Sequence, residues 1–83
     1  MRYIVYDTAT GTIVRSGFAA DEAAASLQVD ADAGEDLLLV NQATDNGHCI
    51  DDTVFKVNSG TYAYEPIDPG YAGTVPSLEL IAL

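Results

Sequence analysis

The first seventeen residues, MRYIVYDTATGTIVRSG, constrain the fold more than any other part of the chain. Residues 2–6 and 12–15 are rich in β-branched and aromatic side chains, which favour strands. The segment between them ends in Gly11, a residue typical of tight turns. This pattern predicts a β-hairpin that begins at the first residue, and we expect no signal or transit peptide ahead of it.

A short helix is predicted after the hairpin. Residues 19–28 are rich in Ala, which favours helix, and Asp21 and Glu22 stand where negative charge stabilises a helix start. Apolar residues at one-face spacing predict the side of the helix that packs on the rest of the domain. That side consists of Ala20, Ala23, Ala24 and Leu27.

Two further segments have the character of strands. Residues 37–40 are continuously apolar, which predicts a strand buried on both faces, or one in a sheet that the helix covers. Residues 48–50 and 53–57 flank an Asp-Asp pair and predict a second hairpin. The predicted fold class is therefore α+β and mostly β: a small antiparallel sheet of four or five strands, one short helix and an extended C-terminal arm.

Pro and Gly become frequent after Asn58. Because Pro interrupts strands and helices, residues 59–83 are expected to form an arm rather than a core element. The chain then divides into a β-rich domain over residues 1–58 and an arm over residues 59–83 that docks on a partner or a neighbouring subunit. Tyrosines and a strongly apolar end, both suited to interfaces, predict the docking residues. These are Tyr62, Tyr64, Tyr71, Leu78, Leu80, Ile81 and Leu83.

The charge balance excludes several classes of function. Thirteen acids against Arg2, Arg15 and Lys56 give a net charge of −10. Direct binding to nucleic acid needs clustered Lys and Arg, so neither nucleic acid nor an anionic membrane surface is an expected partner. No apolar run reaches the ~18 residues of a membrane span. The acidity has two interpretations: solubility through mutual repulsion, or an acidic face that meets a basic partner.

An acidic segment that begins at Asp30 has some of the spacing of a calcium loop. Such a loop requires an oxygen ligand at its fifth position, Gly at its sixth and Glu at its twelfth. Those positions hold Gly34, Glu35 and Asn41. The segment therefore predicts a solvated acidic loop, and no metal ligands are assigned.

His48 and Cys49 do not form a predicted catalytic pair. Adjacent residues of a strand point to opposite faces, so the imidazole of His48 would not reach the thiol of Cys49. We expect a buried Cys49 and a His48 at the strand edge. A single Cys also excludes an internal disulfide and suits a reducing compartment. No catalytic, cofactor or metal-binding residue is predicted, and no small-molecule substrate is expected.

Several short motifs resemble a group of small tailed-bacteriophage proteins, most of them virion or tail-fibre-associated. The pattern Tyr-Ile-Val-Tyr-Asp-x-x-Thr-Gly-x-Ile-x-x-Ser-Gly covers residues 3–17. An acidic Gly-Glu pair at residues 34–35 precedes the predicted strand at 37–40, and His-x-Ile-Asp-Asp follows at residues 48–52. The resemblance covers about residues 3 to 57. The chain departs from the pattern at Cys49, where an aromatic residue is usual, and throughout the arm.

This resemblance implies a structural role and no catalytic residues. We expect a non-enzymatic component of a tailed-phage virion that docks on a larger virion protein, at the tail fibre or tail tip, or on copies of itself. It would be made in the host cytoplasm and reside in the virion. Two alternatives stay open: a head decoration (cement) protein of the capsid, and an acidic inhibitor that mimics nucleic acid and blocks a basic host protein.

Overall fold

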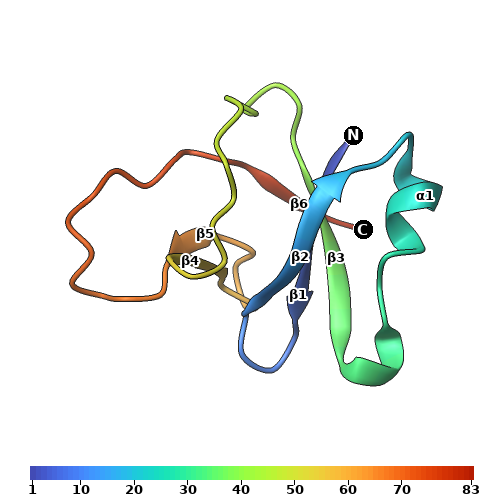
Figure 1. Cartoon of the computed structure of the whole chain (residues 1–83), viewed down its shortest axis with the longest axis horizontal. Coiled ribbons are helices and arrows are strands. Elements are labelled where there is room, and N and C mark those ends of the chain that lie inside the picture. Colours follow the sequence, from blue (N-terminus) through green and yellow to red (C-terminus); the bar gives the residue numbers. More distant parts are fainter.

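Strands dominate the computed structural model, which describes residues 1–83 (Figure 1). The elements follow in the order β1 (Arg2–Asp7), β2 (Ile13–Phe18), α1 (Glu22–Ser26), the 3-10 turn η1 (Ala31–Ala33), β3 (Glu35–Val40), β4 (Phe55–Val57), β5 (Tyr64–Pro66) and β6 (Leu80–Ala82). The predicted α+β, mostly β fold class is confirmed, with six strands instead of four or five.

A four-stranded antiparallel sheet in the order β2-β1-β3-β6 forms the centre of the protein. The predicted hairpin forms its first half, and β1 pairs with β2 on one side and with β3 on the other. Tyr3 of β1 lies opposite Gly17 of β2 and Leu39 of β3. A bulge interrupts the β1–β2 pairing between Val5 and Tyr6. The strand predicted at residues 37–40 is confirmed as the buried part of β3.

Both faces of the sheet are covered, because successive residues of β1 and β3 point to opposite sides. Tyr3, Val5, Leu37 and Leu39 form one cluster with Ala25 of α1. Their neighbours in the same two strands, Ile4, Tyr6, Leu38 and Val40, form a second cluster with side chains of β4 and β5. The sheet therefore lies between α1 and the β4–β5 pair (Figure 1), and we call its two sides the helix face and the β4–β5 face.

The second hairpin predicted at residues 48–50 and 53–57 is wrong. Residues 48–50 form no strand, and β4 pairs instead with β5, with Phe55 opposite Pro66 and Val57 opposite Tyr64. The carbonyl of Asp51 accepts hydrogen bonds from the amides of Val54 and Phe55, which forms a turn directly before β4, and β5 occupies the edge of β4. The carbonyl of His48 accepts a hydrogen bond from the guanidinium of Arg2.

The helix is shorter than predicted, and its predicted apolar face is wrong. Asp21 caps it by accepting a hydrogen bond from the amide of Ala24 (2.8 Å). The helix ends at Ser26, so Leu27 is its C-cap and its side chain is 83% exposed. Ala25 is the residue of α1 that is buried against the sheet.

The arm packs on the rest of the chain. Residues 59–83 contribute β5 and β6, one strand to each sheet. Tyr64 and Leu78 are only 6% and 7% exposed and belong to the cluster on the β4–β5 face. Pro66 interferes little, because it stands at the last position of a strand that is three residues long.

Gly11 joins the hairpin turn to the second sheet. Its φ of +78° lies in the left-handed region. The amide of Val57 donates to its carbonyl (2.9 Å), and a Cβ at this position would overlap the carbonyl oxygen of Val57. Gly is therefore required at position 11 for two reasons: the backbone conformation, and the close approach of β4.

Comparison of Gly11→Ala with Gly47→Ala separates these two requirements. Gly47 also has a positive φ (+74°), but nothing lies within 4 Å of the site of its missing Cβ. We expect Gly47→Ala to lower the free energy of unfolding by about 1–2 kcal/mol through backbone conformation alone. Gly11→Ala should lower it by about 2–5 kcal/mol, because overlap with β4 adds to that cost. Urea unfolding of both variants measures the difference, and equal losses would contradict the close approach.

Leu78→Ala tests whether the arm belongs to the core. Truncation of the buried Leu78 should lower the protein's free energy of unfolding by about 2–5 kcal/mol. Val75→Ala is the matched control in the same segment, because Val75 is 41% exposed, and it should change the stability by less than about 0.5 kcal/mol. Thermal and urea unfolding measure both variants. An arm that docked only on a partner would give two small effects.

Candidate functional site

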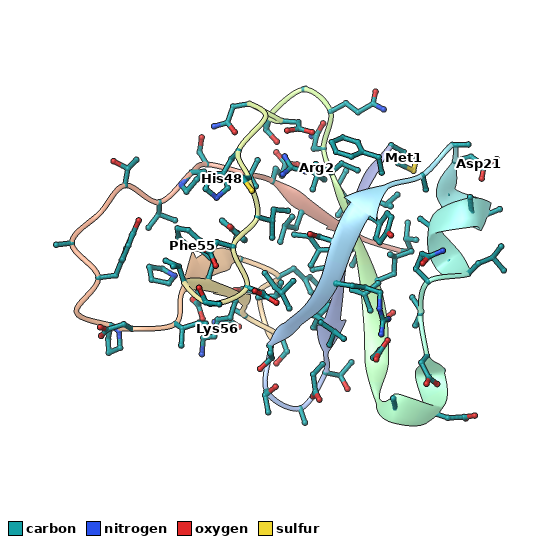
Figure 2. All side chains as sticks on the ribbon, in the orientation of Figure 1. Met1, Arg2, Asp21, His48, Phe55 and Lys56 are labelled. Carbon is teal, nitrogen blue, oxygen red and sulfur yellow. The ribbon has the colours of Figure 1, made fainter.

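An aromatic cluster ties the segment before β4 to β5. The Nε2 atom of His48 lies 3.0 Å from the Oη atom of Tyr64. The ring of Tyr64 stacks on Phe55 with a centroid distance of 4.7 Å, and Tyr71 meets Phe55 edge-on at 5.5 Å. Figure 2 shows His48 and Phe55 on the same side of the sheet. These residues fill the space beside β4, so their role here is to hold the second sheet.

The residues predicted at an interface separate into two groups. Tyr64 and Leu78 fill this chain's own core, and Tyr71 and Leu80 are half-buried against it. Tyr62, Ile81 and Leu83 are exposed.

Ile81 belongs to β6, an open edge of the main sheet, and Leu83 follows that strand. β6 pairs with β3 through Leu39 opposite Ile81, and no strand pairs with its other side. The amide of Asn41 donates to the carbonyl of Glu79 (2.9 Å). Bonded and non-bonded pairs alternate in an antiparallel ladder. The backbone N–H and C=O groups of Leu80 and Ala82 therefore point away from β3, toward the open edge.

A mostly apolar hollow of about 290 Å³ lies beside this edge. Four of its six lining residues are apolar, and none has a charged side chain. Figure 2 shows Met1 at this end of the sheet, toward α1. We call the hollow and the open edge of β6 (Leu80–Ala82) together the β6 corner. The hollow is lined by Met1, Leu39, Val40, Asn41, Gln42 and Ile81.

The sequence signals only part of the β6 corner. The short apolar run from Leu80 to Leu83 is compatible with a strand, in which Ile81 would share a face with Glu79 and Leu83. Met1 and Leu39 carry no such signal, because their approach depends on the pairing of β3 with both β1 and β6.

The opposite edge of the sheet is protected. β2 has the bulge near Val5, and it carries Arg15 in its middle. The guanidinium of Arg15 forms an ion pair with Glu35, with one nitrogen–oxygen distance of 3.2 Å, and also donates to the carbonyl of Gln28 (2.6 Å). Bulges and charged side chains are features that discourage pairing at an edge.

Every cationic side chain of the protein has an acidic partner. Arg2 contacts Asp45 at 2.9 Å, Arg15 contacts Glu35, and the Nζ atom of Lys56 lies 3.9 Å from Glu65. Three of the thirteen acids are used in this way, which leaves the other ten without a cationic partner. The uncompensated side-chain charge of the protein is therefore entirely negative.

Several acids organise turns. Asp30 accepts a hydrogen bond from the amide of Asp32 (3.1 Å) at the start of η1. The amide of Gly47 donates to Asp45, and this bond is the largest of the contacts that lower the pKa of that carboxyl. Hydrogen bonds of this kind are typical of Asx turns. No group of three or more His, Cys, Asp or Glu residues is arranged to hold a metal ion.

The expected burial of Cys49 at a strand is wrong. Cys49 is exposed, and its neighbour His48 is half-buried against Tyr64. In this irregular segment the His48 carbonyl accepts from Arg2, and the His48 imidazole packs edge-on against Phe55, which leaves Cys49 on the solvent side.

A second hollow, of about 430 Å³, lies along β5 and the residues that follow it. Its lining includes Lys56, Glu65 and Asp68, and a single hydrophobic residue. The Lys56 charge is already paired with Glu65, so this hollow offers no free cation to an anionic ligand.

No protein-family model, curated protein or solved structure matches this chain. None of the protein's helices has the length and the apolar character needed to span a membrane.

Tyr64 should give the protein a defined loss of stability at alkaline pH. Burial raises its pKa from 10.0 to about 12. The unfolded chain then loses this proton before the folded protein does. The stability is therefore complete below about pH 10 and falls as the pH rises through about 12. Urea unfolding measured across this pH range should show a shallower fall in stability for Tyr64→Phe than for the wild type. Tyr62→Phe, at an exposed position, is the control and should keep the wild-type slope.

Proposed function

We propose that this protein is a non-enzymatic structural component of a tailed-phage virion, docked on a larger virion protein at the tail fibre or tail tip. The observation that carries the docking role is the β6 corner, where an unpaired strand edge adjoins a mostly apolar hollow whose lining has no charged side chain. Exposed apolar surface next to unpaired backbone groups is unfavourable in water and becomes favourable when another protein covers it.

The virion assignment rests on the sequence motifs of residues 3–17 and 48–52. Both segments have structural roles in this fold. The first forms the hairpin and the Gly11 turn, and the second includes His48, which contacts Tyr64. The motifs support a shared small scaffold, and the β6 corner supplies the surface by which such a scaffold would be held.

A second candidate is an acidic inhibitor that mimics nucleic acid and blocks a basic host protein. The observation that favours it is the set of ten acids without a cationic partner. Competition with nucleic acid is its distinguishing property. A mimic would displace DNA from a basic host protein, whereas a virion component would sediment with particles.

Mass spectrometry of purified phage particles tests the proposal. Particles from the phage that encodes this chain should contain it at a constant ratio to the major structural proteins. Ile81→Asp places a carboxylate in the β6 corner and should reduce incorporation by about tenfold or more, because an unpaired charge in an apolar contact costs several kcal/mol.

Val75→Asp is the matched control, since Val75 and Ile81 have the same exposed fraction of 41% and Val75 lies outside the β6 corner. It should be incorporated at the wild-type level. Absence of the wild-type chain from washed particles would overturn the virion role, and displacement of DNA from a host protein would favour the mimic.

A further inference from the structure

We infer that the open edge of β6 receives an extended, basic segment of the partner as an added strand. The inference rests on the proposed docking function and names its mode and the chemistry of the partner. Strand addition uses backbone hydrogen bonds for affinity and alternate side chains for specificity. Both parts of this requirement are present at β6.

The backbone groups that an added strand would use are those of Leu80 and Ala82. The bonded pairs with β3 fall at Glu79 and, two residues further, at Ile81. Leu80 and Ala82 thus direct two N–H donors and two C=O acceptors outward. A partner strand in register would satisfy all four groups without disturbing the ladder to β3.

Side chains beside the edge define which residues the added strand would carry. Ile81 lies on the helix face opposite Leu39, next to the hollow that Met1 also lines. An apolar side chain of the partner would enter this hollow, since its lining is mostly apolar and has no charged side chain. The next residues of the partner strand, on either side, would point to the other face of the sheet.

Charge complementarity selects a basic segment. All three cationic side chains of the protein are paired with acids, whereas ten acids have no cationic partner. One of those ten, Glu79, stands directly before β6 and is exposed. A cationic strand is attracted by this charge, whereas a second copy of the chain would add its own charge of −10 to the same assembly.

The β6 edge is also the less protected of the two edges. β2 has a bulge and the paired Arg15. β6 has neither a bulge in its pairing nor a charged residue among its three residues. Its short length keeps the contact small, which suits a reversible docking strand rather than uncontrolled sheet growth.

Peptide titration followed by NMR amide hydrogen exchange tests the inference. The probe is the capped peptide Lys-Val-Lys-Val-Lys-Val-Lys, and the matched peptide Glu-Val-Glu-Val-Glu-Val-Glu has the same strand pattern with opposite charge. The Lys peptide should bind about tenfold or more tightly than the Glu peptide, with an affinity that falls as salt increases. Exchange of the Leu80 and Ala82 amides should slow on binding, while the Ile81 amide, already bonded to β3, should change little.

Ala82→Pro removes one outward N–H and leaves the bonds of Glu79 and Ile81 to β3 in place. It should weaken the Lys peptide about five- to tenfold, as expected for loss of one hydrogen bond. Ala72→Pro, in the exposed loop before β6, should bind like the wild type. Should Ala82→Pro disturb the fold, Ile81→Lys provides a second test, because a cation in the hollow should repel the same peptide.

The outcomes separate this inference from the proposed function. Binding without protection of Leu80 and Ala82, or equal binding of both peptides, would overturn strand addition. Self-association of the chain through protected β6 amides would identify a second copy as the occupant and also overturn it. Normal incorporation of Ala82→Pro into particles would remove the β6 mode while the virion role stands. Absence of the wild-type chain from particles would remove the virion role whatever the peptides show.

Discussion

The antiparallel pairing of β1 with β3 is the interaction on which the rest of the structure depends. Both strands are buried on two sides, so each side-chain position belongs to one of two clusters. Val5 and Leu37 face α1, while Ile4 and Leu38 face the β4–β5 pair. A shift of one residue in this register would exchange the two sets of side chains. The helix, the second sheet and the β6 edge all take their positions from this pair.

Arg2 gives the sheet a polar link to the irregular chain that follows β3. It is buried, and its guanidinium contacts both Asp45 and the carbonyl of His48, with the ring of Phe18 5.6 Å away. A buried cation requires such partners. The contact lies in the segment in which residues 48–50 form no strand and Cys49 is exposed. It also removes one of only three cationic side chains from the surface.

Charge and edge protection give the proposed docking surface its character. Pairing of all three cationic side chains leaves an acidic exterior, and the residues of the β6 corner have no charged side chain. The acidic exterior repels a second copy of the protein and attracts a positively charged chain. The strand edge of β6 has no charged side chain that would hinder such a chain from pairing with it. The two properties together favour a partner over self-assembly.

Much of the fold could be predicted from local pattern. The hairpin of residues 2–18 and the strand at residues 37–40 follow from β-branched residues, a Gly turn and a continuous apolar run, which act over a few neighbouring residues. The helix start at Asp21 follows in the same way, but its buried side does not. Because the helix has only five residues, the spacing of apolar residues does not show whether Ala23 or Ala25 is the buried one.

The sequence by itself determined the mostly β class, the first hairpin, the doubly buried strand and the acidic balance, because each depends on residue type and short-range spacing. Only the tertiary structure decided that β4 pairs with β5 and that Tyr64 and Leu78 fill the core. The frequent Pro and Gly of residues 59–83 indicate that strands in this segment are short, but they do not indicate which surface those strands cover. The open edge at β6 likewise depends on the order of strands, a property set by contacts between residues as distant as Leu39 and Ile81.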